Sequence, residues 1–215
     1  MNWRLLRKLA WIDTRARFVA GTPFNGSLLD IGSSDGETLN HFAELRPDLR
    51  FYATDIAGSP EEYPPGTEFH RGNVEKESLP WPDASFDAIT CMHLVEHLGD
   101  HASLFSEVSR LLKPGGRVYF ETPHPKTLNL PSAKGRFTLN FFDDPTHVDV
   151  VTTSQIAEAS EANGLSVINS GISRNLIFAA VYAFYFFCPP SRQRFTALTH
   201  WIGWSAYLIA QKPSK

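Results

Sequence analysis

Short apolar runs alternate with amphipathic helical patterns along the chain from residue 27 onward. The apolar runs predict strands at 27–31, 50–55, 67–71, 86–92, 117–121, 165–168 and 204–210. Apolar residues at helical spacing predict helices over 37–45, around 104–112 and over 154–163. Strands that alternate with helices are typical of β-α-β units, so the pattern predicts an α/β protein with a parallel sheet.

Three further segments stand out. Apolar residues among the first 20 suit an amphipathic helix over 1–20, either packed on the domain or placed over a ligand as a lid. Residues 122–150 form a stretch too long for a plain connector, and we expect it to shape a site. Residues 176–187 are almost entirely apolar but fall short of the roughly 20 needed to span a bilayer. We expect a buried helix, a homodimer contact or a peripheral membrane contact there.

Composition narrows the class of protein. A chain of 215 residues suits one domain over 1–215, and a net charge of −3 offers no basic stripe for nucleic acid, so we expect no nucleic-acid partner. The two cysteines, Cys91 and Cys188, predict neither a disulfide framework nor a zinc site and favour a cytoplasmic location. Charges interrupt the apolar residues at the N-terminus, which argues against a signal peptide.

The turn after the first predicted strand suits a charged metabolite. Gly32 and Gly36 let the backbone approach a ligand, and the helix that follows presents free N–H groups to an anionic group. Asp55 ends the second predicted strand about twenty residues later, where a carboxylate can accept both hydroxyl protons of a ribose. Asp55 could instead cap a loop, and a glycine turn alone is weak evidence. Together the two features favour a nucleoside-type cofactor site.

A series of motifs resembles the class I S-adenosylmethionine-dependent methyltransferases in order and spacing across residues 27–121. The motifs are Asp30-x-Gly32-x-Ser34-x-Gly36, Asp55, Gly72-Asn73-Val74, residues 79–87, residues 95–98 and residues 111–116. Residues 91–97 are similar to the segment after strand four in the small-molecule branch that includes the ubiquinone-biosynthesis O-methyltransferases. The resemblance implies a Rossmann-like, doubly wound α/β fold. Its sheet would be mostly parallel and seven-stranded, with helices on both faces and an antiparallel last strand.

The resemblance also implies S-adenosyl-L-methionine as cofactor and a division of the chain into a cofactor-binding core over 27–121 and acceptor-side elements over 122–215. The cofactor-binding residues that it implies are Asp30, Gly32, Ser33, Gly36, Asp55, Ile56, Asn73, Val74 and His93. The glycines, Ser33 and His93 would lie at the methionine end, with Asp30 fixing the loop or meeting the amino group. Asp55 would bind the ribose, and the remaining three would form the adenine pocket. Ser34 departs from the family, which has a glycine at that position.

Methyl transfer needs a base only when the acceptor atom carries a proton. His97, His124 and His147 are candidates because imidazole can accept a hydroxyl proton, and His97 and His147 are our predicted catalytic residues. Ubiquinone-type relatives have a carboxylate and histidine cluster after strand four that can hold a divalent cation. His93 replaces the first carboxylate here, so we predict no metal.

We expect the acceptor to be a small molecule that offers a hydroxyl oxygen, because residues 141–148 resemble a stretch in methyltransferases that act on glycans and secondary metabolites. Two alternatives stay open. A non-catalytic cofactor-binding or regulatory module would keep the same residues. A serine hydrolase could use Ser34, since residues 32–36 match G-x-S-x-G, although a hydrolase needs strands before that turn. A dehydrogenase fits poorly, because Ser34 stands at the second glycine of G-x-G-x-x-G.

Overall fold

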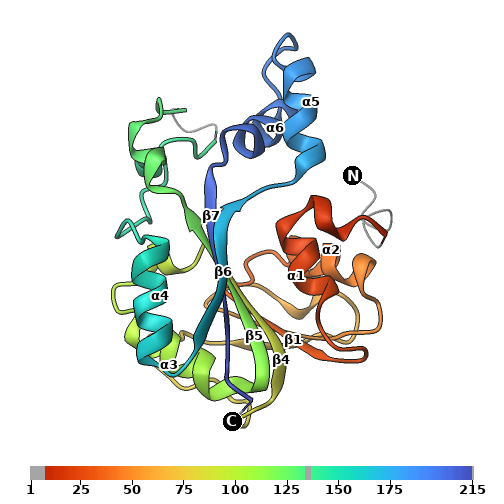
Figure 1. The fold of residues 1–215 in the computed structure, drawn as a ribbon, viewed down its shortest axis with the longest axis vertical. Coiled ribbons are helices and arrows are strands. Elements are labelled where there is room, and N and C mark those ends of the chain that lie inside the picture. Colours follow the sequence, from red (N-terminus) through yellow and green to blue (C-terminus); the bar gives the residue numbers. More distant parts are fainter. Residues whose placement is uncertain (1–7, 134–136, 215) are drawn as a thin grey trace.

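The sheet follows the prediction in the number of strands and in its mostly parallel direction with an antiparallel last strand. The computed structural model describes residues 8–133 and 137–214 (Figure 1). The strands lie in the order β3-β2-β1-β4-β5-β7-β6. The pairs among β1 to β5 are parallel, whereas β7 runs antiparallel to both β5 and β6. The strands are β1 (Ser27–Ile31), β2 (Arg50–Asp55), β3 (Glu68–Arg71), β4 (Phe86–Met92), β5 (Leu112–Pro123), β6 (Ser166–Ser173) and β7 (Ser205–Gln211). The predicted fold class is confirmed.

Helices cover both faces of this sheet. One face carries α1 (Thr14–Ala20) and α2 (Glu37–Leu45), and the other carries α3 (Ala102–Leu111) and α4 (Thr153–Ala162) (Figure 1). Successive residues of β1 enter separate apolar clusters, with Leu28 in the cluster that contains Phe42 of α2 and Leu29 in the cluster that contains Leu104 of α3. All five β1 residues are buried, as expected for a strand covered on both faces.

The N-terminal segment differs from the helix expected over 1–20. Residues 1–7 lie outside the described residues. In the described part, a short 3-10 helix, η2 (Ala10–Ile12), is separated from α1 by Asp13, whose backbone is extended. The Asp13 carboxylate accepts hydrogen bonds from Ala16 N (2.8 Å) and Asn175 Nδ2 (2.9 Å). The chain therefore breaks at Asp13, which caps α1 and ties it to the residues that follow β6.

Strand five is longer than its predicted core of 117–121. Residues 113–116, which follow the helix predicted around 104–112, lie within β5 beside a register shift in its pairing with β4, and Gly115 takes a φ of +79° there. The predicted loop over 122–150 carries two short 3-10 helices, η5 (Pro125–Asn129) and η6 (Phe141–Asp143). Another, η3 (Pro60–Glu62), precedes β3, and η4 (Val95–His97) follows β4.

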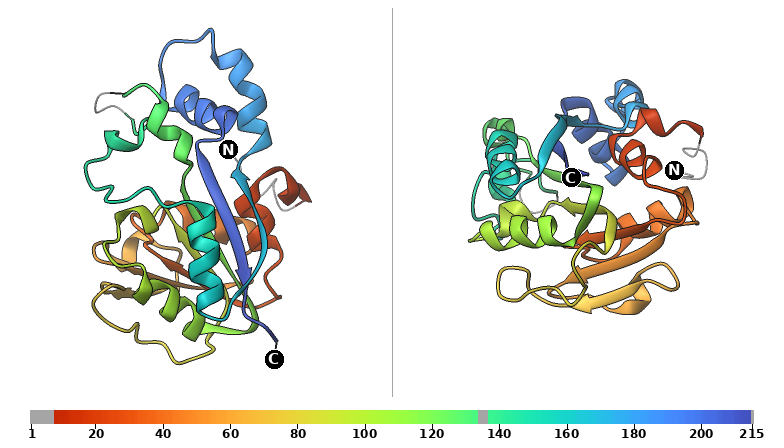
Figure 2. Two further views of the ribbon diagram at one scale, coloured as in Figure 1. Left: turned by 60° about the vertical axis from the view of Figure 1, so that its left-hand side comes forward. Right: turned by 60° about the horizontal axis from the view of Figure 1, so that its bottom comes forward.

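The apolar segment over 176–187 forms α5 (Leu176–Tyr185), which packs against a helix that the pattern did not predict, α6 (Arg192–Ile202). The expectation of a buried helix is wrong, because Ala179 is the single buried residue of α5. The two helices form a hairpin that projects beyond the sheet, on the opposite side of the molecule from the C-terminus (Figures 1 and 2). Among the described residues, no helix is both long enough and apolar enough to cross a membrane.

Candidate functional site

A cavity of about 430 Å³ opens at the carboxyl ends of β1, β2 and β4. Strand order reverses between β1 and β4, and in open α/β sheets such a reversal is where ligands bind. Its size is within the range of about 300–1,000 Å³ typical of small-molecule pockets. The cavity is lined by Ile31, Gly32, Ser34, Thr54, Asp55, Ile56, Gly72, Asn73, Val74, Glu75, His93, Leu94, His97, Leu98 and Thr146.

The turn after β1 forms one wall of this cavity and depends on left-handed backbone conformations. Gly32 has a φ of +78°, and a Cβ there would lie 3.1 Å from Leu94 Cδ1. Ser34 takes a φ of +49°, a left-handed conformation that glycine adopts with less strain than serine. Its backbone is held from both sides, since Ser34 N donates to Asp55 Oδ2 (2.8 Å) and Tyr63 Oη donates to Ser34 O (2.9 Å). Serine is tolerated because these bonds fix the turn.

Asp55 lies at the end of β2 and faces the same cavity. Its Oδ2 accepts the bond from Ser34, and its Oδ1 accepts a bond from Ala57 N (3.0 Å). An ionised carboxylate has about four acceptor positions, so two remain for other donors. A carboxylate fixed in orientation with two open acceptor positions can bind a pair of neighbouring hydroxyl groups.

Comparison with known proteins decides the family. The family described as "Methyltransferase domain" matches residues 3–170, which include the β1 turn, Asp55 and the segment after β4. The chain belongs to the class I S-adenosylmethionine-dependent methyltransferases. It is therefore an enzyme of the transferase class, and S-adenosylmethionine is its cofactor.

Individual relatives agree with this assignment. The methyltransferase is 29% identical to the ubiquinone biosynthesis O-methyltransferase of Paracidovorax citrulli over 175 residues, which cover 76% of this chain and 71% of that protein. It is 32% identical to the protein of the same name from Albidiferax ferrireducens over 149 residues, 65% of this chain and 57% of that protein. The chain thus spans between 57% and 71% of these two relatives. A solved S-adenosylmethionine-dependent methyltransferase from Mesorhizobium loti shares the fold, with a TM-score of 0.64 at 19% identity over 91% of this chain and 96% of that one.

The residues of the cavity fit this cofactor in kind. Asp55 offers acceptors for ribose hydroxyls, and Ile56, Val74 and Leu98 supply apolar contact of the sort an adenine ring needs. Six of the residues that the sequence predicted for the cofactor line the cavity: Gly32, Asp55, Ile56, Asn73, Val74 and His93.

Asp30, Ser33 and Gly36 are not among the lining residues. Asp30 is buried and accepts a hydrogen bond from Thr90 Oγ1 (2.6 Å). Burial raises its pKa to about 7, against the opposing effect of the Thr90 bond. Ser33 Oγ lies 2.8 Å from Tyr63 Oη, and Gly36 is packed so tightly that a Cβ would lie 2.6 Å from Glu62 O. These three residues support the turn without lining the cavity. Their contact with the cofactor stays a prediction.

A second cavity of about 520 Å³ adjoins the first, and His93 and His97 line both. Its walls come from α1, the ends of β5, β6 and β7, the loop over 137–147 and α6. The lining residues are Arg15, His93, Glu96, His97, Glu121, Phe137, Thr138, Asp144, His147, Ser173, Arg192, Phe195, Thr199, His200, Trp204 and Ser205.

A buried charge network forms the floor of the second cavity. Glu121, 1% exposed, receives two bonds from the Arg15 guanidinium, at 2.9 Å (Nε) and 2.5 Å (Nη2), and one from Tyr119 Oη (2.7 Å). His93 Nε2 lies 3.3 Å from Glu121 Oε1, and His93 Nδ1 lies 3.1 Å from Glu96 Oε1. Burial opposes the charge on His93, but the two carboxylates raise its pKa to about 9. His93 is therefore a cation at neutral pH and cannot accept a proton.

His97 is oriented as a proton acceptor. Its Nδ1 lies 3.2 Å from Thr146 O and 3.0 Å from Thr146 Oγ1, and Thr146 Oγ1 donates to Asp144 Oδ1 (2.6 Å). Because a carbonyl oxygen can only accept, Nδ1 carries the proton and Nε2 keeps a lone pair. His147 has the same tautomer, since its Nδ1 donates to Phe141 O (2.6 Å). The rings of His97 and His147 lie 4.8 Å apart between centroids.

His124 lies apart from both cavities and caps η5 by accepting a bond from Lys126 N (3.1 Å). Glu96, His97 and His147 offer possible metal-ligand atoms within 4.8 Å of one another. Both oxygens of Glu96 already have partners, His93 and Thr122 Oγ1 (3.2 Å). The prediction that no metal is bound stays a prediction.

The sequence pattern missed several residues of the second cavity. Arg15 and Glu121 are separated by 106 positions, and no local spacing links them. Glu121 could have been suspected, because it is an acidic residue at the end of an otherwise apolar strand. No sequence pattern indicated Thr146 or Asp144. They emerge only from the hydrogen bonds in the structure, because Thr146 Oγ1 contacts His97 and donates to Asp144.

Proposed function

We propose that this methyltransferase transfers the methyl group of S-adenosylmethionine to a hydroxyl oxygen of a small-molecule acceptor held in the second cavity. The observation that carries the proposal is the junction of two cavities at His93 and His97. A cofactor placed on Asp55 and an acceptor placed near Trp204 would meet at these two histidines.

When bound, the cofactor supplies an activated methyl group on a sulfonium. The chain's own contribution is alignment and proton removal. Asp55, Gly32 and the turn after β1 fix the position of the cofactor, and the walls of the second cavity restrict the acceptor. Such alignment makes a bimolecular displacement effectively unimolecular and contributes several kcal/mol.

We assign proton removal to His97. Its Nε2 has the lone pair, and the chain from Nδ1 through Thr146 to Asp144 holds the ring in that tautomer. The acceptor hydroxyl would give its proton to Nε2 as its oxygen bonds to the methyl carbon, while the carbon–sulfur bond of the sulfonium breaks and leaves a neutral thioether. His93 is a positioning residue, because its positive charge is held by Glu96 and Glu121. His147 is the alternative base, and its ring adjoins His97.

The relatives named ubiquinone biosynthesis O-methyltransferase support an oxygen acceptor. A cavity of about 520 Å³ suits a small molecule, and the net charge of −3 supports the absence of a nucleic-acid substrate. We also propose a cytoplasmic location, because Cys91 and Cys188 are both free.

The test is transfer of labelled methyl from S-adenosylmethionine to a panel of phenols and sugar hydroxyls, with amines and carbon acids beside them. We expect hydroxyl acceptors to be methylated and His97→Gln to lower kcat by roughly 10²–10⁴. The matched control, His124→Gln, should leave kcat unchanged because His124 lies outside both cavities. Transfer confined to amine or carbon acceptors would refute the oxygen assignment. An unaltered kcat in His97→Gln would refute the base and turn attention to His147→Gln.

A further inference from the structure

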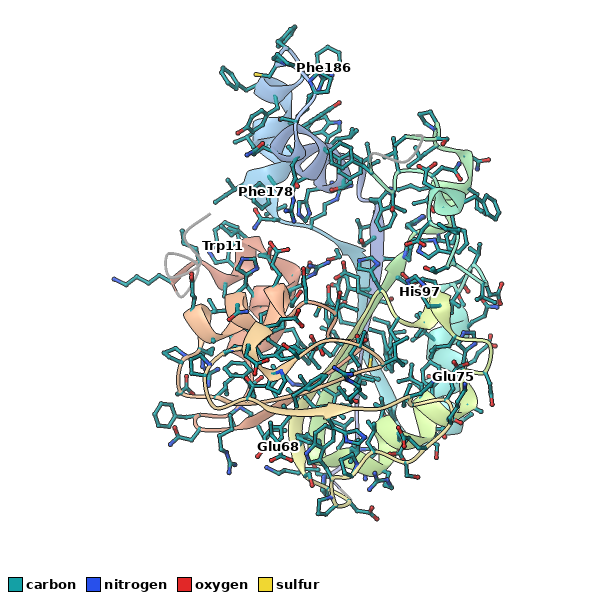
Figure 3. All side chains as sticks on the ribbon, turned by 180° about the vertical axis from the view of Figure 1, so that it is seen from behind. Trp11, Glu68, Glu75, His97, Phe178 and Phe186 are labelled. Carbon is teal, nitrogen blue, oxygen red and sulfur yellow. The ribbon has the colours of Figure 1, made fainter. Side chains whose placement is uncertain are left out.

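The far end of the α5–α6 hairpin, residues 176–204, exposes an unusual set of large apolar side chains. Phe184 is 75% exposed and Phe187 is 85% exposed, and Phe186 between them is more than half exposed. Trp201 is also more than half exposed but lies nearer the base of the hairpin, with its ring 6.0 Å from that of Tyr182. Figure 3 shows Phe186 at the far end of the hairpin and Phe178 nearer its base. Exposed apolar residues gathered on one projecting element mark a surface that docks on something else.

The hairpin suits contact with a lipid surface, but it is too short to penetrate deeply into a bilayer. At 1.5 Å per residue, the 10 residues of α5 extend about 15 Å, half the hydrocarbon thickness of a bilayer. Tyr182, Tyr185 and Trp201 accompany the phenylalanines, and tyrosine and tryptophan favour the boundary between lipid headgroups and hydrocarbon. The geometry therefore suits a hairpin that inserts its end into one leaflet.

Charge identifies the kind of lipid. The chain after Glu161 contains no Asp or Glu, whereas it contains five Lys and Arg residues, although the whole protein has a net charge of −3. Two of these residues lie in the hairpin itself, at the start of α6. Arg192 pairs with Glu37 (3.3 Å), whereas Arg194 donates to Cys188 O, in the loop that follows the exposed phenylalanines. An arginine beside exposed aromatics, on a hairpin that contains no acidic residue, complements the negative surface of a bilayer that contains anionic phospholipid.

A second copy of the chain fits this surface less well. A two-fold contact through the end of the hairpin would bring Arg194 of both copies near one another, with no carboxylate in the hairpin to offset them. The opposite face of the hairpin is already occupied, because Phe178, Arg192, Thr196 and His200 line a cavity of about 330 Å³ that adjoins the acceptor cavity through His200. One face thus covers the acceptor side and the other is free.

We propose that the α5–α6 hairpin docks this methyltransferase on anionic phospholipid membranes through Phe184, Phe186 and Phe187, assisted by Arg194. The inference goes beyond the proposed function and stands on the surface alone.

The experiment is co-sedimentation of the full chain with vesicles of phosphatidylglycerol and phosphatidylcholine, or of phosphatidylcholine alone. We expect binding to the mixed vesicles, weaker binding to phosphatidylcholine, and a decrease with added salt. Phe184→Ser with Phe187→Ser should weaken binding roughly tenfold or more, because two aromatic rings no longer enter the lipid. Phe24→Ser is the matched control. Phe24 is 80% exposed and precedes the amino end of β1, whereas the hairpin follows the carboxyl end of β6, so this substitution should leave binding intact.

Calorimetry with S-adenosylhomocysteine checks that every variant is folded. Equal vesicle binding by the double variant and wild type would overturn the hairpin assignment. Wild-type protein that binds S-adenosylhomocysteine but no vesicles would also overturn the hairpin assignment. That result would leave the methyl-transfer proposal intact. A dimer that the double variant abolishes, without vesicle binding, would assign the surface to a second copy instead. Vesicle binding without methyl transfer would contradict only the proposed function.

Discussion

Replacing Glu121 by glutamine removes one negative charge from the buried network on the floor of the second cavity. Glu121 accepts from Arg15, His93, Tyr119 and Ser173 and is 1% exposed. Glutamine keeps the shape but has one acceptor oxygen, and its NH₂ group must face a donor. Arg15 and His93 would then share the cavity floor with a single remaining carboxylate, Glu96.

The expected cost is large for one substitution. Removing one partner of a buried ion pair costs about 3–5 kcal/mol, because the other charge stays buried and unpaired. For a domain of this size, each kcal/mol lowers Tm by about 2–4 °C, so the variant should melt roughly 6–20 °C below wild type. An exposed pair costs far less. Glu37→Gln is the control, since Glu37 is 56% exposed and lies 3.3 Å from Arg192, and it should cost less than about 1 kcal/mol.

Urea unfolding of wild type, Glu121→Gln, Glu37→Gln, Arg15→Met and the Arg15→Met/Glu121→Gln double variant measures these costs. We expect the double variant to lose less than the sum of the two single losses, because Arg15 and Glu121 interact directly. A loss below about 1 kcal/mol in Glu121→Gln, or strictly additive losses, would refute the buried network as described.

The same network predicts a pH dependence. The pKa of His93 rises from 6.5 to about 9 in the folded protein, so its stabilising effect is complete below pH 6.5 and is lost as pH rises through 9. The full shift corresponds to at most about 3 kcal/mol, since the His93 side chain is 31% exposed. Between pH 7 and 9, wild type should lose stability more steeply than Glu121→Gln, in which the pKa of His93 is lower. Equal slopes would contradict the assignment.

Three further changes test the architecture around the site. Gly36→Ala should destabilise the fold by about 1–3 kcal/mol in urea unfolding, since φ is +71° and the new Cβ would meet Glu62 O, and a neutral result would contradict that packing. Ser34→Gly should leave cofactor affinity within about threefold in calorimetry and raise Tm slightly, because the left-handed backbone no longer strains a side chain. Asp13→Ala should cost about 1–3 kcal/mol through loss of the α1 cap and the Asn175 bond, and hydrogen exchange should localise the loosening to α1.

The core of the fold could be predicted because its local signals agree with its tertiary structure. Strands β1, β2 and β4 and helix α2 have the predicted boundaries, since each apolar run ends at a glycine turn, a charged residue or a proline. Asp55 could be placed at the cavity from its position alone, because it ends β2, and its binding of the ribose stays a prediction.

The remainder depends on contacts that no local pattern contains. The helix predicted over 1–20 is interrupted at Asp13. There the cap of α1 and a bond to Asn175, 162 positions away, outweigh the apolar spacing. A helix over 176–187 was among the expectations, but its exposure was missed because this segment is apolar on all sides and its pattern distinguishes no exposed face. Helix α6 was not predicted. The start of α6 did have a signal in Ser191, which accepts from Arg194 N after a pair of prolines.

The most direct test of the central claim is titration calorimetry of S-adenosylhomocysteine with wild type, Asp55→Ala and the exposed control Asp83→Ala. We predict saturable one-to-one binding to wild type and to Asp83→Ala. Asp55→Ala should bind at least roughly a hundredfold more weakly, since two hydrogen bonds to a charged group contribute about 3 kcal/mol or more. Folded wild-type protein that fails to bind, or an Asp55→Ala variant that binds as tightly as wild type, would contradict the placement of the cofactor at the carboxyl ends of β1 and β2.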